Sequence, residues 1–184
     1  RVLSVVTPDA QRTMFTFLGA SSALNPEDIT DADISDSALV HLEGYLLFNR
    51  PVMDRVLDLA RAHKAKVALD LGSFQVVQAM REYLDELFAR RRIDVLLANE
   101  DEAHAYTGQG ESESLEQFAG KVETAVVKRG KHGALIARGD DRVAPRAVAR
   151  AEHDVAAAQG ERHAARRRVV HDEVRLAAAE RLGR

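Results

Sequence analysis

The segment IDVLLANEDEAHAY, residues 93–106, decides the fold class of this chain. Its first part, Ile93–Ala98, is apolar apart from Asp94 and has the length of a buried strand. Its second part, Asn99–Tyr106, starts with an Asn and carries Glu102 three residues later, a variant of the capping box that opens helices. A buried strand that leads directly into a helix is the unit of parallel, helix-covered sheets, so the segment predicts an α/β fold.

The same alternation continues on both sides of this segment. Val52, Val56, Leu59 and Ala60 share one face of a helix that Pro51 opens. The chain therefore predicts a mostly parallel sheet. Its other strands are expected at Ala38–Leu42, Lys66–Leu71, Thr124–Lys128 and Ala134–Ala137, and its other helices at Asn25-Pro26, Val76–Phe88 and Leu115–Ala119.

The first eighteen residues have a different pattern. Arg1–Val6 and Arg12–Leu18 are rich in strand-forming residues, and the Pro8-Asp9 pair between them is typical of a turn. We expect a β-hairpin here. Because Arg1 already lies in a predicted strand and is not Met, we also expect the chain to begin inside a longer protein.

Composition excludes several function classes. The 184 residues contain no Cys, which excludes a disulfide framework, a thiolate zinc site and a cysteine nucleophile. A net charge of -3 argues against a general nucleic-acid binder. No apolar run has the length of a membrane span, and the first residues show no signal-peptide pattern. We expect a cytoplasmic protein without nucleic-acid or membrane partners.

Ligands of parallel sheets bind beyond the carboxyl ends of the strands, which directs attention to the segments there. Asn99–Glu102 has two interpretations that can hold together: a helix cap, or a site for phosphate and Mg²⁺. Lys128–Gly133 is either a solvated connection or a loop whose glycines let backbone N–H groups approach a nucleotide. The chain has neither a P-loop nor a Gly-x-Gly-x-x-Gly motif. The remaining segments at strand ends are Glu43-Gly44 and Leu71–Ser73.

Five motifs in order give the chain a family resemblance. They are Thr7–Met14, Leu18–Ala20, Leu42–Leu46, Leu97–Ala103 and Val126–Leu135. Together they resemble the ribokinase-like (PfkB) family of carbohydrate and nucleoside kinases, and most closely its bacterial adenosine-kinase-like members. The resemblance covers residues 1–140, and its most specific parts are the Asn-x-x-Glu and Gly-x-x-Gly elements.

The resemblance implies a three-layer α/β sandwich with a small β lid, of which residues 1–18 would be a part. It implies transfer of the ATP γ-phosphoryl group, with Mg²⁺, to a hydroxymethyl group of a nucleoside or sugar. Asn99 and Glu102 would organise the phosphates and Mg²⁺, Glu102 through water. The other residues that the resemblance assigns are Lys128, Gly130 and Gly133 for the nucleotide, Arg12 in the lid, and Glu43 and Gly44 at the substrate cleft.

The departures from the family pattern are equally informative. The sequence contains no Asp-Thr-x-Gly-Ala-Gly-Asp motif, which in the family supplies an anion hole and the catalytic base, and it lacks the family's N-terminal Gly-Gly motif. No catalytic residue is therefore assigned, and we expect this chain to be inactive. Residues 141–184, rich in Ala and Arg, stand where the motif is expected. They are interpreted either as a frameshifted end or as a tail with a helix around Val169–Arg181.

Two other functions stay open at this point. One is a non-catalytic nucleotide-binding or interaction module. The other is an unrelated α/β domain in which Asn99–Glu102 is only a helix cap. The sequence does not decide between a nucleoside and a sugar, and it leaves the oligomeric state open.

Overall fold

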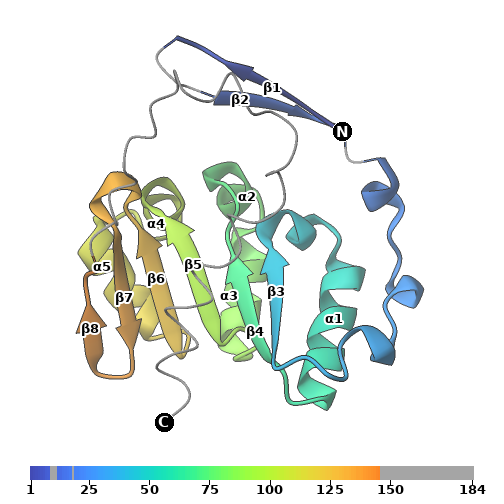
Figure 1. Cartoon of the computed structure of the whole chain (residues 1–184). Helices are drawn as coiled ribbons and strands as arrows, with labels where there is room; N and C mark the ends of the chain where they lie inside the picture. Colours follow the sequence, from blue (N-terminus) through green and yellow to red (C-terminus); the bar gives the residue numbers. More distant parts are fainter. Residues whose placement is uncertain (9–11, 18, 146–184) are drawn as a thin grey trace, which may run out of the picture. The chain divides into compact units, whose positions relative to one another are not determined.

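The structure is a computed structural model that describes residues 1–8, 12–17 and 19–145. Its main sheet has six strands in the order β3-β4-β5-β6-β7-β8 (Figure 1). Strands β3 to β6 are parallel, and β7 runs antiparallel to both of its neighbours, β6 and β8. The predicted α/β fold with a mostly parallel sheet is confirmed. The strands are β3 (Leu39–Glu43), β4 (Lys66–Asp70), β5 (Val95–Asn99), β6 (Thr124–Lys128), β7 (Ala134–Arg138) and β8 (Asp141–Val143).

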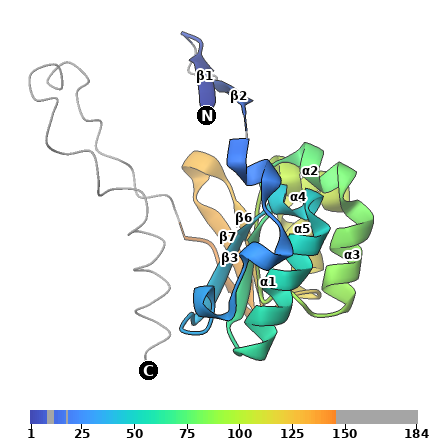
Figure 2. The same cartoon turned by 90° about the vertical axis from the view of Figure 1, so that its right-hand side faces the viewer.

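The α-helices of the described residues cover one face of this sheet (Figure 2). Alternate strand residues such as Leu69, Leu96 and Val127 are fully buried on this side, where the apolar faces of the helices pack. Within residues 1–8, 12–17 and 19–145, none of the helices is long and apolar enough to span a membrane. The helices are α1 (Arg50–Ala62), α2 (Phe74–Ala79), α3 (Arg81–Ala89), α4 (Glu100–Thr107) and α5 (Glu111–Ala119).

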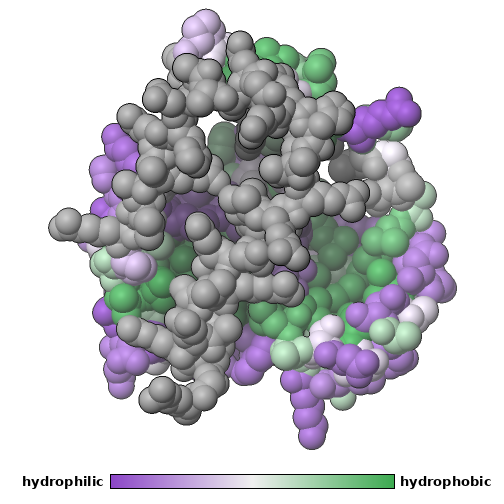
Figure 3. All heavy atoms as spheres, in the orientation of Figure 1, coloured by the Kyte–Doolittle hydropathy of each residue, from purple (hydrophilic) through white to green (hydrophobic). Residues whose placement is uncertain are grey.

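The opposite face of the sheet is apolar as well. Val95, Leu97 and Val126 alternate with the buried residues of β5 and β6 and are half-buried. Figure 3, seen from the side of Figure 1, shows hydrophobic residues on the visible parts of this face. The described residues thus provide the sheet and one helical layer of the α/β sandwich.

The predicted hairpin forms a separate two-stranded sheet from β1 (Val2–Val6) and β2 (Arg12–Thr16). The two strands are antiparallel, and Val6 pairs with Arg12 next to the turn. Apolar side chains of both strands, including Leu3 and Phe15, are exposed.

Short 3₁₀ helices complete the connections. They are η1 (Gly19–Ala23), η2 (Pro26–Asp28), η3 (Asp31–Asp33), η4 (Gly44–Phe48) and η5 (Gly130–His132). The helix start predicted at Asn25-Pro26 is confirmed: Asn25 is the N-cap of η2, a 3₁₀ helix that begins at Pro26 and ends at Asp28.

The single helix predicted over Val76–Phe88 is wrong. The backbone of Met80 has φ -111° and ψ 18°, which ends α2 and starts α3. The residues predicted to face inward are buried on both sides of the break, namely Val76, Met80, Leu84, Leu87 and Phe88. The apolar periodicity therefore continues across the break and cannot reveal it.

Two features lie at the end of the described chain. Strand β8 has no counterpart among the predicted strands, and it pairs with β7 through Ile136 and Val143. It occupies the first residues of the predicted tail, 141–184. The helix expected around Val169–Arg181 lies outside the described residues.

An ion network ties the amino ends of three strands together. The Nζ of Lys66, at the start of β4, lies 3.0 Å from Asp94 and 2.6 Å from Glu123. Asp94 also accepts a hydrogen bond from the backbone N–H of Val67. This edge is opposite to the one that carries the candidate site.

Candidate functional site

The carboxyl ends of four neighbouring strands bring the predicted site residues to one edge of the sheet. In the strand register Glu43 is opposite Asp70, and Asn99 is opposite Lys128. Asp70 is in turn opposite Leu97 of β5. Four segments that lie far apart in the sequence therefore meet at this edge, as the parallel arrangement predicts.

Asn99 and Glu102 form a complete capping box at the start of α4. The backbone N–H of Glu102 donates to Oδ1 of Asn99 over 2.8 Å. In return, Oε2 of Glu102 accepts from the backbone N–H of Asn99, and Oε1 accepts from its Nδ2, each over 2.8 Å. The structure thus confirms the cap. These bonds also fix the carboxylate of Glu102 in one position at the carboxyl edge.

Glu102 is a buried acid, with only 2% of the residue exposed. Burial raises the pKa of its carboxyl group, while the hydrogen bond from Asn99 and the charge of Lys128 oppose this shift. A buried carboxyl group is costly unless it is paired or hydrogen bonded. The capping box and the nearby ammonium group supply that compensation.

Lys128 and Asp70 form an ion pair at this edge. The Nζ of Lys128 lies 2.6 Å from Oδ2 of Asp70, although β5 separates their two strands. Oδ1 of Asp70 accepts a hydrogen bond from the backbone N–H of Gly72. Asp70 was missed in the sequence, where its available signal was an acid at the end of an otherwise apolar strand.

Gly44 has a packing role at the end of β3. A Cβ atom at this position would lie 2.1 Å from the carbonyl oxygen of Leu71. The backbone of η4 can therefore approach the end of β4 only because residue 44 is a glycine. The neighbouring Glu43 is exposed, and its carboxylate lies 3.7 Å from Nε2 of His41.

The loop after β6 is a turn of 3₁₀ helix, η5, between two glycines with positive φ. Gly130 has φ 48° and Gly133 has φ 91°. The preceding Arg129 forms an ion pair with Glu111 at the start of α5, with 2.6 Å between Nε and Oε2. The loop is thus anchored on one side, and a Cβ at Gly130 would meet nothing within 4 Å.

Exposed aromatic side chains follow the first two strands of the sheet. Tyr45 in η4 is 58% exposed, and Phe74 at the start of α2 is 42% exposed. A Cβ at Gly72 would lie 3.4 Å from the ring of Tyr45, which places this ring at the end of β4. Neither residue was predicted from the sequence, since a single aromatic residue after a strand has no distinctive pattern.

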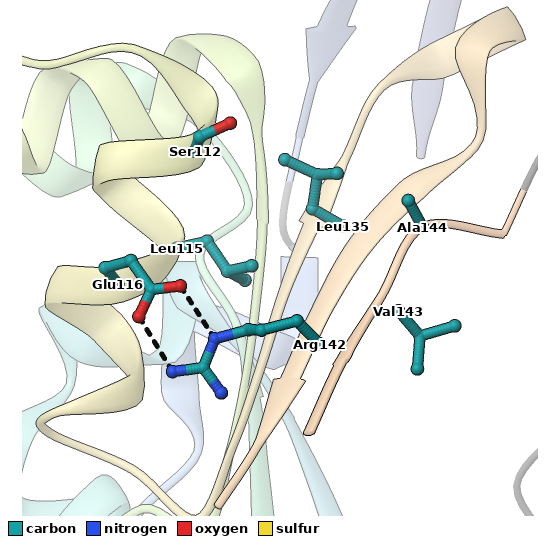
Figure 4. Close-up of a pocket in the computed structure, with 7 residues that line it drawn as sticks. All are labelled: Ser112, Leu115, Glu116, Leu135, Arg142, Val143 and Ala144. Atoms are coloured by element: carbon teal, nitrogen blue, oxygen red, sulfur yellow. Dashed lines mark hydrogen bonds and ion pairs between the residues drawn. The ribbon is translucent and has the colours of Figure 1, made fainter. Parts of the chain in front are cut away.

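A shallow pocket lies elsewhere, between α5, β7 and β8 (Figure 4). Leu115, Leu135 and Val143 form its apolar lining. Its charged groups, Arg142 and Glu116, are joined by two contacts of 2.7 Å and neutralise each other. We assign no ligand to this pocket.

The remaining predicted residue, Arg12, begins β2 in the hairpin. Within the described part of the chain, no cluster of three or more His, Asp or Glu could hold a metal ion by itself. Mg²⁺ usually keeps several waters and binds through one or two carboxylates together with substrate phosphates, so Glu102 is the residue to test for it here. Because both oxygens of Glu102 accept hydrogen bonds from Asn99, contact through water fits this residue better than direct ligation.

These features define a ribokinase-like α/β protein. They are a mixed six-stranded sheet covered by helices, with a capped helix and a glycine loop at its carboxyl edge. The chain belongs to the pfkB family of carbohydrate kinases, whose model matches residues 2–158. The family resemblance noted in the sequence is thus confirmed.

Solved structures show the same relationship. The chain is 30% identical to adenosine kinase from Sinorhizobium meliloti, with a TM-score of 0.75, and 27% identical to a probable sugar kinase from Rhizobium etli CFN 42, with a TM-score of 0.76. Both matches cover 80% of this chain and 46% of the other. The chain therefore spans about half the length of these relatives.

A more distant structure shares the fold alone. It is a putative ribokinase II from E. coli in complex with ATP and Mg²⁺, 17% identical, with a TM-score of 0.65. That match covers 79% of this chain and 49% of the other.

Proposed function

We propose that this chain carries the ATP–Mg²⁺ half-site of a PfkB-type kinase. The parent activity is transfer of the γ-phosphoryl group of ATP to a hydroxymethyl group of a nucleoside or sugar. The observation that supports this most is the placement of the Asn99–Glu102 box beside Lys128 at the carboxyl edge of the sheet. We further propose that the protein acts on a small molecule in the cytoplasm.

Each of these residues has a role that follows from its chemistry. Glu102 is held rigidly by Asn99 and would orient the water shell of Mg²⁺. Lys128 would place a positive charge near the phosphates, and Gly130 and Gly133 leave the backbone of the η5 loop open to the nucleotide. When bound, Mg²⁺ would neutralise phosphate charge, because phosphoryl transfer depends mainly on positioning and charge stabilisation.

We propose that nucleotide binding is retained in this chain while phosphoryl transfer is lost. The sequence lacks the Gly-Ala-Gly-Asp segment of the family and with it the base that accepts the substrate proton. Loss of a general base alone lowers a rate by about 10²–10⁴-fold. Loss of the anion hole lowers it by about 10²–10³-fold more. We therefore propose that this chain binds the nucleotide without measurable phosphoryl transfer, in effect as a non-catalytic nucleotide-binding module.

The acceptor is proposed to be a nucleoside rather than a plain sugar. Tyr45 and Phe74 expose aromatic rings beyond β3 and β4, next to Glu43 and Gly44. Aromatic side chains at such an edge stack on flat bases, which a sugar alone does not offer. Arg12 in the hairpin keeps its proposed place in the lid.

Isothermal titration with ATP, with and without Mg²⁺, tests the half-site. The proposal predicts saturable binding by the folded chain that weakens when Mg²⁺ is removed. A coupled assay with adenosine, ribose and fructose should give no turnover. A folded sample that does not bind ATP–Mg²⁺ would reject the half-site, and clear phosphorylation of any acceptor would reject the inactive state.

A further inference from the structure

Lys128 is the one residue of the proposed nucleotide site whose position depends on an acid on a non-adjacent strand. Its side chain has four carbons and many rotamers, so an unrestrained ammonium group would lose considerable entropy on binding an anion. In the structure Nζ is already held, 2.6 Å from Oδ2 of Asp70. The ion pair reaches over the end of β5, the strand that carries Asn99.

Asp70 is itself fixed in place. Its other oxygen accepts the backbone N–H of Gly72, and only 19% of its side chain is exposed, compared with 41% for Lys128. The acid is thus the rigid partner and the ammonium group the accessible one. Since an ammonium group has three N–H donors, Lys128 can keep its bond to Asp70 and still donate to a phosphate oxygen.

We propose that Asp70 is a positioning residue, which holds the ammonium group of Lys128 at the carboxyl edge so that it is ready to bind a nucleotide phosphate. This inference rests on the proposed function and adds a residue to it. In this role Asp70 affects phosphate binding only indirectly, through the position of Lys128.

An alternative role for Asp70 predicts the opposite change in ATP affinity when the residue is replaced. If Asp70 acted only as a negative charge near the phosphates, its removal would strengthen ATP binding. If it positions Lys128, its removal weakens ATP binding, because the ammonium group must then be ordered by the ligand. The two roles can therefore be separated by measuring an affinity.

The experiment is a cycle of four proteins, wild type, Asp70→Asn, Lys128→Met and the double variant, each titrated with ATP–Mg²⁺ in the full chain. Asp101→Asn is the control, because this exposed acid also lies at the start of α4 and makes the same charge change without bonding to Lys128. Thermal unfolding of each variant checks that it is folded.

We expect Asp70→Asn to weaken ATP–Mg²⁺ binding by about fivefold and Lys128→Met by about tenfold or more. The double variant should bind no more weakly than Lys128→Met, and Asp101→Asn should bind at least as tightly as wild type. Unchanged or tighter binding by Asp70→Asn overturns the proposal, as does an equal loss in both backgrounds. Failure of the wild type to bind ATP–Mg²⁺ instead rejects the proposed function.

Discussion

Asn99 and Glu102 are joined by three hydrogen bonds. In two of them the side chain of each residue accepts from the backbone N–H of the other, and in the third Nδ2 of Asn99 donates to Oε1 of Glu102. The bonds that cap α4 are therefore the same bonds that orient the buried carboxylate. The two interpretations of this segment are compatible, because a rigid cap is also a rigid support for bound phosphate and Mg²⁺.

Glu102→Gln tests this double role. The amide cannot accept both bonds from Asn99, so the free energy of unfolding should fall by about 1 kcal/mol. If Glu102 orients the water around Mg²⁺, affinity for ATP–Mg²⁺ should fall by about tenfold or more, since hydrogen bonds to a charged group contribute about 1.5–3 kcal/mol. Urea unfolding and calorimetry measure the two effects, with Asp101→Asn as the control of equal charge. A variant that is less stable but binds ATP–Mg²⁺ normally would show that Glu102 acts only as part of the helix cap.

Gly44→Ala should damage the edge on which the site is built. The added Cβ would lie 2.1 Å from the carbonyl oxygen of Leu71, a backbone atom that cannot move alone. We expect a loss of about 3 kcal/mol or more of unfolding free energy. Gly108→Ala is the matched control. Its φ is 71° but nothing lies within 4 Å of the added Cβ, so it should cost about 1 kcal/mol. Equal losses in urea unfolding would contradict the close approach.

Lys66→Met should remove the ion network at the amino edge. Lys66 and Glu123 are both more than one third exposed, so solvent screening limits the loss at pH 7 to about 0.5–1 kcal/mol. The bond to Lys66 lowers the pKa of Glu123 below its ordinary value of 4.5. The stabilisation from this ion pair is therefore fully present above pH 4.5. It is lost as the pH falls through the lowered pKa of Glu123 in the folded chain.

The check is the difference in unfolding free energy between wild type and Lys66→Met as a function of pH. It should be constant from about pH 5 to pH 8 and shrink in more acidic solution. Lys64→Met makes the same charge change at an exposed residue and should show no such pH dependence. A difference that grows with acidity would contradict the network.

Tyr45→Ala tests the proposed nucleoside acceptor. Loss of a stacking ring costs about 1–3 kcal/mol per base, so adenosine affinity should fall by about fivefold or more while ribose binding is unchanged. Leu39→Ala is the control, because this residue is 51% exposed at the opposite end of β3. Equal titrations of wild type and Tyr45→Ala with adenosine would argue against the aromatic site.

Local patterns predicted the part of the fold in which one strand meets one helix. The strand Thr124–Lys128 has the predicted bounds, and Asn99 caps α4 as its spacing with Glu102 indicates. These features depend on residues that are close in sequence. The break at Met80 was missed because a change in the φ and ψ angles of one residue leaves no trace in the apolar periodicity.

The site was predicted less completely for a related reason. Asn99, Glu102 and Lys128 were found through local motifs and the family resemblance. Asp70 was not, because its partner Lys128 is 58 positions away and the contact exists only after three strands have aligned. The packing role of Gly44 depends in the same way on how closely β4 approaches.

Hydrogen–deuterium exchange of the folded chain, with and without ATP–Mg²⁺, tests the central claim most directly because it locates the binding site. We predict slower exchange at two separate segments, the start of α4 at Asn99–Glu102 and the loop Gly130–Gly133. Little change is expected along the pocket of Figure 4. Binding that protects neither segment, or no binding by the folded chain, would contradict the assignment of a nucleotide half-site to this edge of the sheet.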